Sequence, residues 1–226
     1  MSILKIISQV CNPLQENSYL VADTTTGTCL LIDPGYYTRQ ERDFLCKQLL
    51  DGHITPTAIL LTHSHIDHVL GLAWAVRTFN IPYYQAADDV ANLRACAVYA
   101  PMYGIPDFEP PATPATIINE VGLATAALGQ APTLVLGGFA IGVLQTPGHA
   151  AGHLSFYFED LGCIVGDTLF AGSIGRTDLP GGNFATLERS IKTQLYTLPV
   201  DTVVYPGHGP ATSIKAEMES NPYVRA

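Results

Sequence analysis

The segment HSHIDH, residues 63–68, gathers three imidazoles and one carboxylate within six positions. It follows the apolar run TAILLTH (57–63), which predicts a buried strand. His63 and His65 are two residues apart, so at the end of an extended segment both side chains point to the same side and can bind one metal ion. Asp67 and His68 are adjacent, and a turn into a following helix can direct both at a second ion.

Four further short motifs lie at the predicted ends of strands, where a rigid sheet can present functional groups. Imidazole and carboxylate side chains suit zinc, iron or manganese. The five cysteines are scattered and none lies near the histidine cluster, so no thiolate site is expected. The motifs are LIDPG (31–35), TPGHAAGH (146–153), GD (166–167) and YPGHG (205–209).

The composition favours a compact globular protein over a disordered, nucleic-acid-binding or membrane protein. The 226 residues are 47% hydrophobic and 14% charged, with a formal net charge of −9 and no cluster of Lys or Arg. A nucleic-acid partner would need a basic surface. The N-terminus does not read as a signal peptide, and no apolar run reaches the length of a membrane span. We therefore expect a soluble cytoplasmic protein, and the sequence leaves a homo-oligomer open.

The order of predicted elements indicates an α/β protein with mixed sheets covered by helices, forming one domain over residues 1–226. The prolines of segment 101–114 predict a surface loop, and Trp74 is expected in the core. Strands are predicted at 2–10, 17–23, 28–33, 57–63, 154–160, 163–167 and 202–208, with two more in 134–146 around Gly137-Gly138. Helices are predicted at 38–52, 69–79, 86–103 and 183–198.

Taken together, H-x-H-x-D-H, T-P-G-H, G-D and P-G-H in this order resemble the metallo-β-lactamase superfamily, and LIDPG resembles its first motif. The segments GDTLFAGSIGRTDLPGG (166–182) and YPGHGP (205–210) resemble the short forms of the glyoxalase II-like hydrolases (hydroxyacylglutathione hydrolase-like). This resemblance implies an αββα sandwich, with two mixed β-sheets flanked by helices.

The resemblance also implies a centre of two divalent metal ions, with zinc expected first and iron or manganese as alternatives. In the family pattern each ion has its own ligand set, and Asp167 bridges the two. Asp33 is expected to orient a ligand or hold its loop, with an ordinary turn aspartate before Pro34-Gly35 as the alternative. His153 is expected to support a ligand or line the pocket without binding metal. The first ion would be held by His63, His65 and His149, and the second by Asp67, His68 and His208.

The resemblance implies that such a centre would hydrolyse a small thiolester, such as S-lactoylglutathione or a related acyl-thiol, by attack of a metal-bridging hydroxide. A leaving thiol with a pKa of about 8.5 needs little help from a general acid. Asp67 is the predicted catalytic group, because it could steer or accept the proton of the water. The sequence extends eighteen residues past His208. It lacks the C-terminal helical region that helps full-length glyoxalase II enzymes hold glutathione, so the thiol carrier stays open.

Several alternatives remain open at this point. Arg176 could touch substrate, or it could form a structural ion pair with Asp178, which we favour. Tyr99 and Tyr103 could line a substrate pocket or only cover the sheet. His53 is expected at the surface.

Other functions of the same superfamily also fit. A mononuclear non-haem iron persulfide dioxygenase would use His63, His149 and Asp167, and a lactonase or β-lactamase would use both metals. A non-catalytic metal-binding protein is disfavoured because no ligand position is lost, and a nuclease because the chain is acidic.

Overall fold

A computed structural model describes residues 3–118, 124–128 and 131–225 of the chain. The chain forms two compact units, residues 1–120 and 121–226, which we call the N-terminal and C-terminal units and describe separately. The expectation of a single domain stays a prediction. Among the described residues, no helix is long and apolar enough to cross a membrane.

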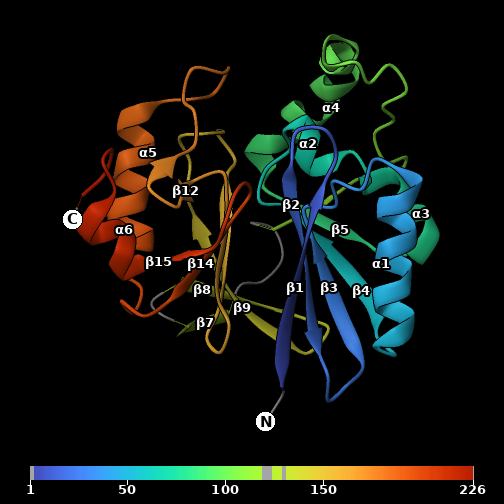
Figure 1. Cartoon of the computed structure of the whole chain (residues 1–226), viewed down its shortest axis with the longest axis horizontal. Helices are drawn as coiled ribbons and strands as arrows, with labels where there is room; N and C mark the ends of the chain where they lie inside the picture. The colour runs from blue at the N-terminus through green and yellow to red at the C-terminus, as the bar shows by residue number, and fades with distance from the viewer. Residues whose placement is uncertain (1–2, 119–123, 129–130, 226) are drawn as a thin grey trace. The chain divides into compact units, whose positions relative to one another are not determined.

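The N-terminal unit is built on a six-stranded mixed sheet (Figure 1). Its first three strands are antiparallel, while β3, β4, β5 and β6 run parallel to one another. The sheet order follows the sequence: β1 (Leu4–Cys11), β2 (Glu16–Asp23), β3 (Thr28–Ile32), β4 (Thr55–Leu60), β5 (Tyr83–Gln85) and β6 (Thr116–Ile117).

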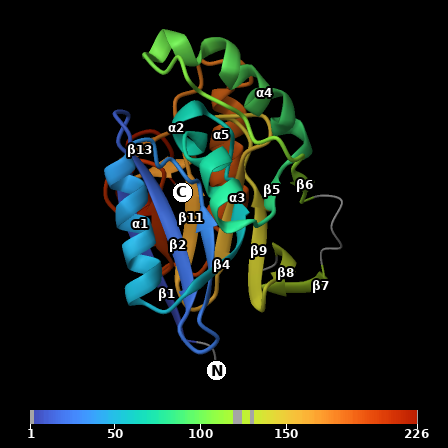
Figure 2. The same cartoon turned by 90° about the vertical axis from the view of Figure 1, so that its right-hand side faces the viewer.

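Two helices, α1 (Arg39–Asp51) and α3 (Leu72–Phe79), cover one face of this sheet (Figure 2). A capping box begins α1, because Thr38 accepts from the Glu41 N–H and the Glu41 side chain accepts from the Thr38 N–H. The apolar sides of α1 and α3 pack on the strands of the sheet. They form one core cluster that includes Leu31, Leu45, Leu49, Ile59, Leu72 and Val76. The remaining helical segments of this unit are α2 (Ile66–Val69), η1 (Ala87–Asp89), α4 (Val90–Tyr99) and η2 (Ala100–Tyr103).

The C-terminal unit contains a seven-stranded mixed sheet in the order β15-β14-β11-β10-β9-β8-β7. Among the described strand pairs of this sheet, only β11 and β14 are parallel. Strands β12 and β13 form a separate two-stranded antiparallel sheet. Helices α5 and α6 pack against β11 and β14 through Leu187, Ile214, Cys163 and Val204 (Figure 1). The elements are β7 (Ala124–Leu128), β8 (Ala131–Leu136), β9 (Phe139–Gln145), β10 (Leu154–Phe158), β11 (Gly162–Gly166), β12 (Leu169–Phe170), β13 (Ser173–Ile174), α5 (Phe184–Ser190), η3 (Ile191–Leu195), β14 (Val203–Pro206), β15 (Thr212–Ser213) and α6 (Ile214–Ser220).

The predicted α/β class with two mixed sheets and covering helices is confirmed, but several boundaries were wrong. The predicted helix 69–79 is broken at Leu70-Gly71 into α2 and α3. A Cβ on Gly71 would lie 2.8 Å from the Tyr36 carbonyl oxygen, so this close approach requires glycine. Trp74 is only half-buried, at the edge of the core. The helix predicted at 86–103 is three consecutive segments, and the one at 183–198 ends in a π-helical turn.

Candidate metal centre

In the N-terminal unit, the candidate ligands lie at the edge where the parallel strands β3 and β4 end. Asp33 follows β3, and residues 61–65 follow β4. The Asp33 N–H donates to the carbonyl of Leu60, the last residue of β4, at 3.1 Å. Because neighbouring parallel strands end at the same edge, Asp33 and the histidine segment lie side by side.

The Asp33 carboxylate organises two of the histidines. It accepts hydrogen bonds from the Thr62 N–H at 2.7 Å, from the Thr62 hydroxyl at 2.6 Å and from His68 Nδ1 at 3.0 Å. The Thr62 hydroxyl gives its only proton to Asp33, so it accepts from His63 Nδ1, which lies 3.1 Å away. Both imidazoles therefore carry the Nδ1–H tautomer, which leaves the lone pair on Nε2 for a metal ion.

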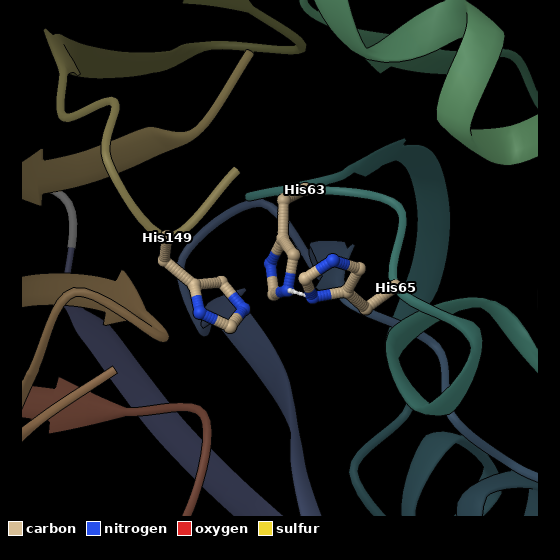
Figure 3. Close-up of side chains that lie close together, drawn as sticks. All are labelled: His63, His65 and His149. Carbon is tan, nitrogen blue, oxygen red and sulfur yellow. Dashed lines mark hydrogen bonds between the residues drawn. The ribbon is translucent and has the colours of Figure 1, made fainter. Parts of the chain in front are cut away.

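His63 and His65 bring two ring nitrogens close together. His63 Nε2 lies 3.1 Å from His65 Nδ1, and the two rings are nearly perpendicular (Figure 3). Two nitrogens bound at about 2.0–2.1 Å to one tetrahedral zinc would stand roughly 3.3 Å apart. The observed spacing fits two ligands of one ion.

Asp67 and His68 lie in the single helical turn α2, which begins directly after His65. The turn brings Asp67 Oδ2 to 3.9 Å from His68 Nε2, although the two side chains would face apart on an extended chain. The His68 ring is fully buried, and its centroid lies 4.2 Å from that of His63. The N-terminal unit thus gathers His63 and His68 around Asp33, with His65 beside His63 and Asp67 beside His68.

In the C-terminal unit, Asp167 and His208 follow the two parallel strands β11 and β14. The Gly207 N–H donates to the Gly166 carbonyl at 2.7 Å, which joins the two strand ends. As in the N-terminal unit, parallel pairing places both functional residues at one edge of the sheet.

One carboxylate oxygen, Asp167 Oδ2, lies between two imidazoles. It is 3.5 Å from His149 Nε2 and 3.6 Å from His208 Nε2. His149 Nδ1 lies 2.8 Å from the Arg176 carbonyl, which can only accept, so His149 donates there and keeps its lone pair on Nε2. His149 stands on the loop between β9 and β10 (Figure 3). Asp167 therefore has the position that a bridging carboxylate needs.

His153 forms a hydrogen bond with the backbone of Asp167. Its Nε2 accepts from the Asp167 N–H at 3.1 Å, while its Nδ1 lies 2.9 Å from the Thr146 hydroxyl and 3.2 Å from the Thr168 hydroxyl. Both ring nitrogens are thus engaged with the protein. This geometry fits the expected orienting role, and the assignment of site residues itself stays a prediction.

Arg176 and Asp178 form a two-pronged ion pair, with Nε and Nη2 each 2.7 Å from a carboxylate oxygen. Hydrogen bonds from Arg176 lower the pKa of Asp178 to about 2. Both side chains are exposed. The geometry is that of the structural ion pair.

Sequence reasoning missed a buried polar group beneath Asp33 that comes from the loop between β1 and β2. The Asn12 amide donates to the Gly35 carbonyl at 3.1 Å and to the Asp67 carbonyl at 3.0 Å. The Ser18 hydroxyl accepts from the Gly35 N–H and donates to Glu16. Asn12-Pro13 is a turn signal, but nothing in the sequence places Asn12 against Asp67.

Glu16 is fully buried on the all-buried strand β2, with one carboxyl oxygen 4.0 Å from His68 Nδ1. Burial raises the pKa of Glu16 well above its ordinary value. Its neighbours Gln15, Asn17 and Ser18 are polar, so nothing in the sequence marked Glu16 as a buried carboxyl.

A second group supports the backbone between His63 and His65. The Ser64 hydroxyl donates to Gln85 at 3.2 Å, and the Cys96 thiol donates to the Ser64 carbonyl at 3.2 Å. Burial raises the pKa of Cys96 to about 12, so it stays a thiol. The Tyr99 hydroxyl lies 3.0 Å from the Cys96 sulfur, and its ring packs on Tyr103.

Comparison with known proteins shows the family. The model of the metallo-beta-lactamase superfamily matches residues 11–208, so the chain belongs to this superfamily. The probable metallo-hydrolase YqgX of Bacillus subtilis (strain 168) is 37% identical over 214 residues, which are 94% of this chain and 93% of that protein. The hydroxyacylglutathione hydrolase GloC of Haemophilus influenzae is 31% identical over 214 residues, 94% of each chain.

Two solved structures are similar to this chain over nearly its whole length. The B3 metallo-beta-lactamase BLEG-1 superposes with a TM-score of 0.84 and 32% identity, covering 98% of this chain and all of that chain. TTHA1623 in a di-iron-bound form gives a TM-score of 0.78 and 35% identity, covering 96% of this chain and all of that chain.

Proposed function

We propose that this protein is a dinuclear metal-dependent hydrolase of small thiolesters. The observation that carries the proposal is the position of Asp167 Oδ2 between His149 Nε2 and His208 Nε2. The family pattern assigns these two histidines to different ions. A single oxygen within reach of both is what a bridging ligand requires.

The proposal places the ligands of the two units around one pair of ions. Its support is the family match, which spans both ligand sets, together with the two metal ions of TTHA1623. The donor chemistry adds to this, because His63, His68 and His149 each direct Nδ1–H to a protein acceptor and keep Nε2 as the donor atom. Imidazoles and carboxylates suit zinc first, and the di-iron relative makes iron the alternative to test.

When bound, such a pair of ions activates a water and polarises the carbonyl of the substrate. The residues of the chain then have separate roles. Asp33 and the Arg176 carbonyl fix the imidazole tautomers, and His153 holds the Asp167 backbone. Asp67 is the carboxylate placed to steer or accept the water's proton, since the turn of α2 brings it beside His68.

A thiolester is proposed as the substrate because GloC, named as a hydroxyacylglutathione hydrolase, aligns over nearly the whole chain. In the alternative with a single iron ion, His68 would not be a metal ligand. Asp33 accepts hydrogen bonds from Thr62 at 2.6 Å and from His68 at 3.0 Å, which orients His68 as a ligand. This favours a centre of two metal ions over a single iron. BLEG-1 makes a β-lactam the comparison substrate.

Metal content and turnover test the proposal together. Protein stripped with a chelator and reloaded with Zn or Fe should bind two ions per chain and hydrolyse S-lactoylglutathione or a smaller acyl-thiol. His65→Ala should abolish turnover, whereas His53→Asn, on the exposed loop after α1, should leave it unchanged. One ion per chain, or oxygen uptake with glutathione persulfide, would contradict the proposal.

A further inference from the structure

A small pocket lies in the N-terminal unit between the first turn of α1, helix α3 and the loop 105–109. Its volume is about 190 Å³, and its lining includes Arg42, Trp74, Arg77, Phe108 and Glu109. We call it the Arg42 pocket. None of these residues is a predicted ligand or substrate residue.

Two arginines face this pocket. The Arg42 guanidinium lies 5.3 Å from the centre of the Trp74 ring, and its Nε donates to the Tyr36 carbonyl at 3.1 Å. No described residue pairs with the two terminal nitrogens of Arg42. Burial and the charge of Arg77 lower the pKa of Arg42, while the carboxylate of Glu41 acts in the opposite direction. Two guanidiniums that repel each other across a pocket form a site that an anion would stabilise.

The acidic residues of the pocket weaken its attraction for an anion. Glu109 Oε2 lies 3.5 Å from Arg77 Nη1, and Asp107 also lines the pocket. Both partners of the Arg77–Glu109 pair are exposed, so this ion pair is weak and can open. Glu109 therefore competes with a bound anion for the Arg77 guanidinium. Removing the charge of Glu109 should strengthen anion binding.

We propose that the Arg42 pocket binds a small carboxylate, with the carboxylate bridging Arg42 and Arg77 and the apolar part lying against Trp74 and Phe108. The planar fork of a guanidinium matches a carboxylate. A volume of about 190 Å³ admits a monocarboxylate of modest size. This binding site is separate from the proposed hydrolytic one.

Trp74 is the only tryptophan of the chain and lines this pocket, so tryptophan fluorescence reports on the surroundings of Trp74. Benzoate is the probe, benzyl alcohol its neutral counterpart, and inorganic phosphate the compact anion. Benzoate should change the fluorescence saturably, with a dissociation constant on the order of 1 mM. Benzyl alcohol and phosphate should give at least tenfold weaker responses. An equal response to either would overturn the assignment to a carboxylate.

Variants then locate the binding. Arg77→Gln should weaken benzoate binding at least tenfold, while Arg39→Gln, an exposed arginine of α1 paired with Asp43, should not change it. Glu109→Gln should tighten binding about threefold by removing the competing carboxylate. If Arg77→Gln alters the far-UV spectrum, Arg77→Lys replaces it, with binding weakened because the fork is lost. Binding that neither Arg77 variant weakens, or no saturable response at all, overturns the proposal.

Discussion

The carboxylate of Asp33 lies 3.0 Å from His68 Nδ1 and holds this histidine in the tautomer that a metal ligand needs. The same carboxylate reaches His63 through the Thr62 hydroxyl. One residue of the LIDPG motif thus orients two predicted ligands. It does so from a left-handed backbone conformation, φ 49°, which aspartate tolerates better than most residues.

Asp33→Asn is expected to weaken metal binding 10–100-fold, because an amide can donate its proton and no longer enforces Nδ1–H on His68. Competition with a chromophoric chelator measures the affinity. Asp43→Asn, on the exposed side of α1, is the control. Unchanged affinity in Asp33→Asn would remove Asp33 from its orienting role.

Gly175→Ala is expected to lower metal occupancy and activity together. A Cβ at this position would lie 1.8 Å from the Asp167 carbonyl oxygen, so the Asp167 backbone must move. Gly172→Ala in the same hairpin meets nothing within 4 Å, although its φ of +68° carries some strain. It should lose stability by about 1 kcal/mol and keep its metal. Equal metal content in both variants would contradict the expectation.

His153→Phe is expected to lower the free energy of unfolding by about 1–3 kcal/mol, because the buried Asp167 N–H loses its acceptor. Urea denaturation of chelator-treated protein measures this without interference from metal. His153→Gln, which can restore an acceptor, should be less destabilised than His153→Phe. The reverse order would mean that the Asp167 N–H is satisfied elsewhere.

Arg176→Ala is expected to raise the pKa of Asp178 from about 2 toward its ordinary 3.8. The KM for a thiolester should change less than twofold, because the His149 bond uses only the Arg176 carbonyl. Carboxyl NMR titration and steady-state kinetics check the two parts. A large rise in KM would instead assign the guanidinium to substrate.

Glu16→Gln is expected to stabilise the metal-free protein more at pH 8 than at pH 4.5. The folded state raises the Glu16 pKa above its unfolded value, so above pH 4.5 the folded chain holds a proton that the unfolded chain has released. Wild-type stability therefore falls as pH rises through this window, and glutamine removes that slope. Unfolding free energies at the two pH values measure it, with the exposed Glu219→Gln as control.

The motifs allowed much of the candidate site to be predicted, since each ligand type appears directly after an apolar strand. Asp167 and His208 come together because β11 and β14 are parallel neighbours, which the sequence order of motifs implies only through the family resemblance. Asn12, Thr62 and Ser18 could not be predicted, because their importance arises from partners far away in the sequence.

The elements that were missed have different physical reasons. Strand β7, of sequence ATAAL, was missed because alanine is not typical of strands. Strands β5, β6, β12, β13 and β15 have two or three residues each, too few for a period to be visible. Helix α6 has a mostly polar sequence, and it is fixed by the Ser213 cap and by Glu217, which accepts from Gly172, Thr212 and Asn221. Local pattern does not reveal such long-range partners.

The bond between Gly207 N–H and the Gly166 carbonyl has a practical consequence. It belongs to the sheet, so the spacing of Asp167 and His208 does not depend on the exposed residues Asp178 and Pro180. These two residues can be exchanged in libraries that search for altered substrate preferences, while Gly175, Gly182 and the main chain at Arg176 are left untouched. Catalytic geometry and substrate choice could then be varied independently.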